Sequence, residues 1–213
     1  NIVVNMDMED FFPSVHYRRI KGVFRNFGFS ESVAAVLTML CSEPERTEVE
    51  IDGRTFFVAR GERLLPQGAP TSPAITNLIC RGLDARLTKI ASQLGFTFTR
   101  YADDITFSSL DSSADAGRAI RRITHAVSDE GFTIHPGKTR VLRAGRRLEV
   151  TGLTVNKKVS VPRKQLRNFR AVLHQIERDG PAGKKGGSSD NGIASIYGYA
   201  TCVARVDEIG RAC

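Results

Sequence analysis

The chain has 213 residues, 41% of them hydrophobic, and a net charge of +8, so it can bury a substantial core in one large domain or in one domain with an appendage. No apolar run approaches the length of a transmembrane helix and no segment has the pattern of a signal peptide, which argues for a soluble, intracellular protein. The four cysteines and four histidines lack zinc-type spacing. We therefore expect ordinary thiols, and histidines with surface or packing roles.

The chain begins with a strand pattern. Residues 1–12 form an apolar run that ends in acids and two aromatic side chains, which places Asp7 near the C-terminal end of the predicted strand. Apolar residues at helical spacing follow in segment 20–27, and Ser30 can cap a second helix.

A hairpin and a rigid turn are predicted next. Segments 48–51 and 55–58 flank Asp52-Gly53, which is a strong hairpin signal. The proline-containing segment 64–73 then forms a turn in which Gly68 can let another backbone or a flat ligand approach closely.

A long core helix should begin at Ser72-Pro73, because proline suits the first helical position, and Gly95 should end it. Its apolar stripe is expected to be buried. The stripe consists of Ile75, Leu78, Ile79, Leu83, Leu87, Ile90 and Leu94.

Two adjacent carboxylates, Asp103 and Asp104, occupy the bend of a second predicted hairpin, between the apolar runs 96–100 and 105–110. Like charges held close together disfavour joint ionisation unless a cation compensates, and two carboxylates at one point suit Mg²⁺. A solvated Asp-Asp turn is the alternative, since aspartate is common in turns for local hydrogen-bonding reasons.

The C-terminal part alternates helices with short strands. A helix should run from near Ser113 to Gly131, and a helix that begins at Pro162 should bury Leu166, Phe169, Leu173 and Ile176. A Gly, Ser and Lys-rich stretch, 180–192, is typical of a linker. The remaining predictions are strands at 132–135, 141–143, 148–155 and 159–161, and a last helix at 193–205.

Positive charge is concentrated in segment 138–170, which holds eleven Lys and Arg residues against the single acid Glu149. Because the rest of the chain is slightly acidic, this block indicates a surface for a polyanion beside an acidic centre. A solvated face that merely aids solubility is the alternative.

This order of elements predicts an α+β fold of the ferredoxin-like type, an antiparallel sheet with helices packed on one face. In that topology the first strand lies beside the second hairpin. Asp7 and the Asp103-Asp104 turn should then meet at one end of the sheet.

Three segments, taken together, resemble the palm of reverse transcriptases: the strand with Asp7, the Leu-Pro-Gln-Gly-Ala-Pro-Thr-Ser-Pro turn at 65–73, and Tyr-Ala-Asp-Asp at 101–104. Their wording is most similar to the bacterial retron branch, and the resemblance runs from Ile2 to about Asp207. It implies a ferredoxin-like polymerase palm at 1–156, a connection and partial helical thumb at 157–213, and no fingers region.

The resemblance implies a two-metal site. Asp7 and Asp103 would bridge two Mg²⁺ ions, Asp104 would be an auxiliary ligand, and the Met8 carbonyl would complete one coordination shell. Lys138 falls where reverse transcriptases carry a lysine that acts near the leaving pyrophosphate. A solvated lysine is the plain alternative.

Phe12 matches the family position at which a bulky ring excludes a ribose 2′-hydroxyl, whereas without the resemblance it would be a core residue. Gln67 and Gly68 match the motif that lines the nucleotide and template pocket. We also expect primer or nucleic-acid contacts from Val150, Thr151, Gly152, Arg163, Arg167 and Arg170.

The implied function is that of a cytoplasmic bacterial RNA-directed DNA polymerase that uses Mg²⁺, deoxynucleotides, an RNA template and an RNA or DNA primer, with a structured noncoding RNA and an effector protein as further partners and no membrane. Alternatives are a group II intron-like or defence-associated relative and a nonpolymerising nucleic-acid-binding fragment. A nucleotide cyclase would not require the Pro-Gln-Gly turn, and an RNA-directed RNA polymerase would need the space that Phe12 should deny.

Overall fold

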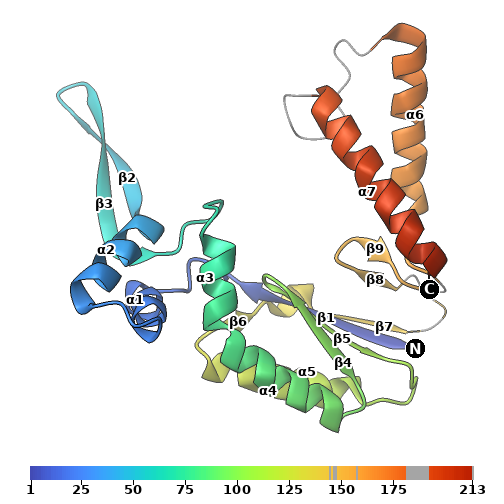
Figure 1. Cartoon of the computed structure of the whole chain (residues 1–213), viewed down its shortest axis with the longest axis horizontal. Helices are drawn as coiled ribbons and strands as arrows, with labels where there is room; N and C mark the ends of the chain where they lie inside the picture. Colours follow the sequence, from blue (N-terminus) through green and yellow to red (C-terminus); the bar gives the residue numbers. More distant parts are fainter. Residues whose placement is uncertain (144, 146–147, 157, 181–191, 213) are drawn as a thin grey trace. The chain divides into compact units, whose positions relative to one another are not determined.

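The computed structural model describes residues 1–143, 145, 148–156, 158–180 and 192–212. Contacts divide the chain into two compact units, Asn1–Val141 and Leu142–Cys213, which we describe separately (Figure 1). This division falls earlier in the chain than the boundary expected after residue 156. The predicted linker lies almost entirely outside the described residues.

The first unit is built on an antiparallel sheet in which β4 (Thr97–Tyr101), β5 (Asp104–Ser109), β1 (Ile2–Glu9) and β6 (Thr133–Ile134) follow one another in that order. Strand β7 (Arg140–Arg143) also pairs with β1. The order places β1 between the β4–β5 hairpin and β6, which is the ferredoxin-like arrangement, so the predicted α+β fold is confirmed.

Helices α4 (Arg81–Gln93) and α5 (Ala116–Asp129) cover one face of this sheet (Figure 1). Alternate residues of β1 point into the core beneath them, because successive side chains of a strand face opposite sides. Asp7 belongs to the other set and therefore lies on the sheet face away from α4 and α5. The β1 core residues are Ile2, Val4, Met6 and Met8, all at most 1% exposed.

The predicted core helix is interrupted, which corrects the sequence analysis. It forms α3 (Ser72–Ile79) and α4, with Cys80 between them at φ −78° and ψ −1°. Cys80 is fully buried, whereas Leu78, expected in the core, is 36% exposed. The apolar pattern continues through Cys80 without a break, so periodicity alone could not reveal the interruption.

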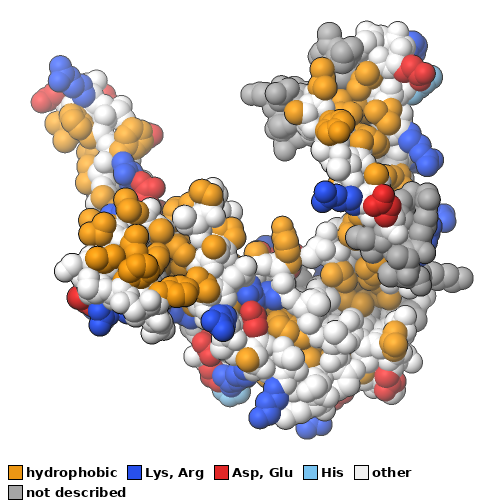
Figure 2. All heavy atoms as spheres, in the orientation of Figure 1, with side chains coloured by type: hydrophobic (Ala, Val, Ile, Leu, Met, Phe, Trp, Pro, Cys, Tyr) orange, Lys and Arg blue, Asp and Glu red, His pale blue; other side chains and the backbone are white. Residues whose placement is uncertain are grey.

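The first hairpin is longer than predicted and forms a separate two-stranded ribbon of β2 (Glu43–Ile51) and β3 (Arg54–Leu64). It follows α1 (Tyr17–Asn26) and α2 (Glu31–Cys41), and Ser30 caps α2 as expected. Figure 2 shows a large apolar surface over this part of the molecule. Its most exposed apolar side chains are Phe27, Val36, Met39, Leu40 and Phe57.

The second unit contains a small hairpin of β8 (Glu149–Val150) and β9 (Leu153–Thr154), then α6 (Arg163–Asp179) and α7 (Gly192–Ala212). A single strand over 148–155 was therefore the wrong prediction: the positive φ angles of Thr151 (46°) and Gly152 (80°) turn the chain back on itself.

The two helices of this unit touch through Phe169 and Tyr199, whose ring centroids are 4.7 Å apart. None of the four α6 residues expected to be buried is fully so: Leu173 is 41% exposed, and the other three, Leu166, Phe169 and Ile176, are partly buried. No helix among the residues described is both long and apolar enough to cross a membrane.

Candidate active site

Strand pairing brings the predicted acids to one end of the sheet. Asp7 on β1 is the direct cross-strand partner of Asp104 on β5, and the Met8 N–H donates a 3.1 Å hydrogen bond to the Asp103 carbonyl. The turn between β4 and β5 places Ala102 at φ 52°. The predicted meeting of Asp7 with the Asp103-Asp104 turn is therefore confirmed.

A pocket of about 440 Å³ opens beside this end of the sheet. Of the eight residues predicted for catalysis, metal binding and nucleotide binding, six line it, whereas Asp104 and Gly68 do not. Its lining residues are Asp7, Met8, Glu9, Asp10, Phe11, Phe12, Pro13, Gln67, Asp103, His135 and Lys138.

Gln67 reaches the pocket because the turn that carries it is tied to the segment after β1. The Leu65 N–H donates to the Val15 carbonyl at 3.1 Å, and the Ser72 hydroxyl donates to the Pro66 carbonyl at 2.7 Å. Two bonds thus fix both sides of Gln67.

Phe12 is half-buried in the pocket wall, and its ring lies 5.4 Å from that of the buried Phe11. The expected core role of Phe11 is confirmed by its 4% exposure. A rigid aromatic edge is therefore available to a molecule that enters the pocket.

Lys138 neutralises part of the negative charge. Its Nζ donates to Asp7 Oδ2 at 2.8 Å from the short 3₁₀ turn Pro136–Lys138. This hydrogen bond and the charge of Asp7 raise the pKa of Lys138. The lysine therefore stays protonated well above neutral pH.

The carboxyl of Asp104 is less readily ionised than that of an ordinary aspartate. Loss of solvent around its carboxyl raises its pKa, the negative charges of Asp103 and Asp7 raise it further, and Lys138 offsets part of the shift. An added cation at this sheet end would relieve that repulsion.

The donor set fits Mg²⁺ in chemistry, because the carboxylates of Asp7 and Asp103 and the main chain of Met8 offer hard oxygen atoms around one pocket. Within the described ranges, however, no group of three or more His, Cys, Asp or Glu side chains is arranged to hold a metal ion. The three acids do not form a ready-made ligand set, since neighbouring residues such as Asp103 and Asp104 tend to face different ways and Lys138 occupies Asp7.

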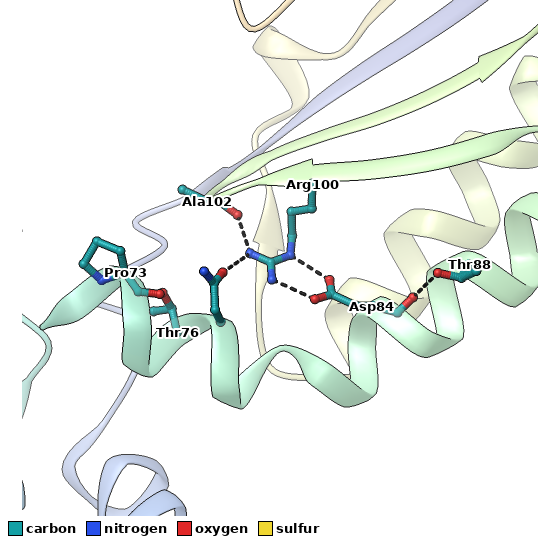
Figure 3. Close-up of polar contacts among 7 residues, drawn as sticks. Pro73, Thr76, Asp84, Thr88, Arg100 and Ala102 are labelled. Carbon is teal, nitrogen blue, oxygen red and sulfur yellow. Dashed lines mark hydrogen bonds and ion pairs between the residues drawn. The ribbon is translucent and has the colours of Figure 1, made fainter.

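The turn with the two acids is braced by Arg100, whose side chain is only 6% exposed (Figure 3). Its guanidinium donates to both carboxylate oxygens of Asp84 on α4, at 2.7 and 2.8 Å, and to the Ala102 carbonyl at 2.9 Å. A further bond of 3.2 Å reaches Asn77 on α3. Arg100 therefore ties the turn to both helices, and the sequence analysis missed this role.

His135 is a second residue that sequence reasoning missed. Its backbone N–H donates to the Asp7 carbonyl at 2.8 Å, and the residue lines the pocket. Its Nδ1 atom is buried without a hydrogen-bond partner among the described atoms. Its position three residues before Lys138 was the available signal.

The predicted nucleic-acid residues lie in the second unit. Val150 pairs with Leu153 in the small hairpin, and Thr151 and Gly152 form its turn. The three predicted arginines of α6 are all exposed, and they are Arg163, Arg167 and Arg170.

Comparison with known proteins identifies the class. Residues 1–166 match the family described as reverse transcriptase (RNA-dependent DNA polymerase), and the chain belongs to this family. Within it the sequence is of the retron type. It is 44% identical to the retron Mx162 reverse transcriptase of Myxococcus xanthus, over 97% of this chain and 45% of that protein. It is 34% identical to the retron Ec86 reverse transcriptase of Escherichia coli, over 83% of this chain and 49% of that one.

The chain thus spans about half the length of the curated relatives it matches. Among solved structures, telomerase from Candida albicans with a fragment of telomeric RNA aligns with a TM-score of 0.54 at 10% identity, over 96% of this chain and 38% of that chain. Apo telomerase from Candida tropicalis also gives 0.54, at 11% identity, over 73% of this chain and 30% of that one. These likenesses support the fold alone.

Proposed function

We propose that the chain is the catalytic part of a retron-type RNA-directed DNA polymerase, which adds deoxynucleotides to a primer 3′-hydroxyl on an RNA template. The observation that carries this proposal is the pairing of Asp7 with Asp104 beside a pocket that also contains Asp103, Phe12 and Lys138. Family membership supports the same reaction.

Asp7 and Asp103 would hold Mg²⁺, with Asp104 as an auxiliary ligand and the Met8 carbonyl as a further donor. Such ions lower the pKa of the attacking hydroxyl and stabilise charge on the entering and leaving oxygens. Arg100 keeps the turn with Asp103 in place while these ligands act.

The pocket walls would select the nucleotide. The ring of Phe12 collides with a 2′-hydroxyl, while Gln67, supported by the backbone freedom of Gly68, contacts the nucleotide and template. This selection favours deoxynucleotides by excluded volume.

Lys138 would leave Asp7 when cations take over that carboxylate and then act near the pyrophosphate. A lysine side chain is ordinarily protonated at neutral pH, so it would act there either as a fixed positive charge or as a proton donor.

The second unit would contact the nucleic acid. Val150, Thr151 and Gly152 offer main-chain groups to the primer backbone, and the exposed arginines of α6 offer charges to phosphates. Residues 1–156 would then be the palm and 157–213 the connection and start of a thumb. A structured noncoding RNA and an effector protein are the partners that a retron enzyme would use.

Primer extension on an RNA template tests the proposal. Asp103→Asn should reduce extension by at least about a hundredfold, because a lost charge ligand removes transition-state stabilisation worth several kcal/mol. Glu48→Gln, which removes an exposed carboxylate from the ribbon, is the matched control and should leave extension unchanged. Normal extension by Asp103→Asn would refute the assignment, and nucleic-acid binding without any extension by the parent would favour a nonpolymerising module.

Sugar choice tests Phe12 separately. Phe12→Ala should raise the use of ribonucleotides relative to deoxynucleotides by roughly ten- to a hundredfold, since the steric conflict is removed. An unchanged ratio, with extension intact, would return Phe12 to a packing role.

A further inference from the structure

The outer side of the helix pair α4 and α5 carries a second cleft, of about 430 Å³. The buried residues of both helices face the sheet, so the cleft lies on the opposite side of the helix layer from the sheet face that carries Asp7. It is thus separate from the pocket described above. Its lining residues are Arg86, Lys89, Ile90, Gln93, Arg122 and His125.

The cleft is a fixed groove between antiparallel helices, held at two points along its length. Arg86 of α4 binds the Asp129 carboxylate of α5 at 2.5 Å, and Arg122 of α5 donates to Gln93 Oε1 of α4 at 2.7 Å. His125 Nδ1 lies 3.2 Å from the other Asp129 oxygen. These bonds orient two guanidinium groups along the rim of the groove.

The charge of the groove is unbalanced. Arg86, Lys89 and Arg122 contribute three positive charges, and the Asp129 carboxylate, which contacts Arg86, offsets one of them. Figure 2 shows Lys and Arg side chains at the molecular surface in the region of α4 and α5. A cleft with an excess of one sign concentrates oppositely charged groups.

We propose that this groove binds phosphate groups of a double-helical RNA segment. Packed helices lie about 8–10 Å apart, so cations from the two sides can contact neighbouring phosphates of one backbone. Arginine recognises phosphate through its planar fork of donors, and a groove that presents charge but few other groups reads the backbone and not the sequence. The inference rests on the proposed function only in taking RNA as the polyanion.

The site would hold a part of the RNA that the catalytic pocket does not contact. Because Asp7 and the groove lie on opposite sides of the sheet and helix layers, one short primer–template duplex cannot fill both. A folded RNA that passes around the palm could occupy the groove while its template region lies at the pocket.

Binding of a blunt RNA duplex, measured by fluorescence anisotropy at several salt concentrations, tests the site. Lys89→Gln combined with Arg122→Gln should weaken binding on the order of tenfold at 0.1 M salt and lower the salt slope by about one per lost phosphate contact. The matched control is Arg81→Gln with Arg121→Gln, which removes the same charge from exposed positions of the same helices outside the groove.

A smaller loss in the control than in the groove variant supports the site, whereas equal losses, or no loss in the groove variant, overturn it. Asp129→Asn gives an opposite and independent test, because removing this acid should tighten duplex binding several-fold. Extension of a saturating primer–template should persist in the groove variant. If the unmutated protein does not extend primers at all, the proposed function is refuted, whereas the comparison of duplex binding between the variants still stands.

Discussion

The β4–β5 and β2–β3 hairpins are similar in sequence character but differ in how far their apolar side chains are buried. In the β4–β5 hairpin, Ile105 and Phe107 are at most 1% exposed, because β1 pairs along one edge and α4 and α5 cover one face. In the β2–β3 ribbon, Phe56 and Phe57 are 47% and 61% exposed. Strand pairing is a local property of the sequence, whereas burial depends on distant partners.

The two hairpins also differ in how firmly their charged residues are held. Of the acids that line the pocket, Asp103 sits in the turn of the buried hairpin, which Arg100 holds, and Asp7 lies on β1, which pairs with that hairpin, while most charged residues of the ribbon are exposed. Functional groups that must be held within a fraction of an ångström are thus placed on the hairpin with tertiary support.

The largest expected difference is in core packing. Phe107→Ala should lower the free energy of unfolding by about 3–5 kcal/mol, since it removes a fully buried ring that packs against Phe96 and Phe98. Phe57→Ala on the ribbon should change it by less than about 1 kcal/mol. Urea unfolding of both variants measures the contrast, and equal losses would show that the ribbon is as well packed as the sheet.

A smaller effect is expected at the ion pairs. Arg100→Gln should cost about 2–4 kcal/mol, because the change leaves Asp84 and the Ala102 carbonyl without their donor. Arg46→Gln, which breaks the exposed pair with Glu43 on β2, should cost less than about 1 kcal/mol. Thermal unfolding checks both values, and a loss below 1 kcal/mol for Arg100→Gln would deny that the brace stabilises the turn.

The smallest effect concerns Asp104 and depends on pH. Its pKa is raised in the folded state, so the folded protein binds more protons and ionisation of Asp104 destabilises the fold as pH rises above the usual aspartate range. Asp104→Asn should therefore raise stability slightly at pH 7, and the gain should disappear as the pH falls below that range. Urea midpoints at several pH values test this, and a gain that grows toward low pH would contradict it.

The sequence predicted the parts of the fold that depend on local patterns. The strand with Asp7, the turn at Asp52-Gly53, the cap at Ser30 and the hairpin with Asp103 and Asp104 are all observed. Topology rules then brought Asp7 beside Asp104 correctly, since the ferredoxin-like order leaves few alternatives.

The remaining features depend on contacts that no local pattern encodes. The interruption at Cys80, the ion pair between Arg100 and Asp84 and the place of His135 in the pocket each arise from tertiary packing. The turn at Thr151-Gly152 was missed for another reason: a short apolar run with one glycine fits a kinked strand as well as a tight hairpin.

The claim that Asp7 and Asp103 hold a divalent metal ion is tested most directly by the binding of Mn²⁺, a paramagnetic substitute for Mg²⁺, followed by electron paramagnetic resonance. The account predicts that the chain binds Mn²⁺ and that Asp7→Asn and Asp103→Asn each weaken binding by about tenfold or more, while Glu48→Gln leaves it unchanged. Equal Mn²⁺ affinity in the parent and in both pocket variants would contradict a metal site at this end of the sheet.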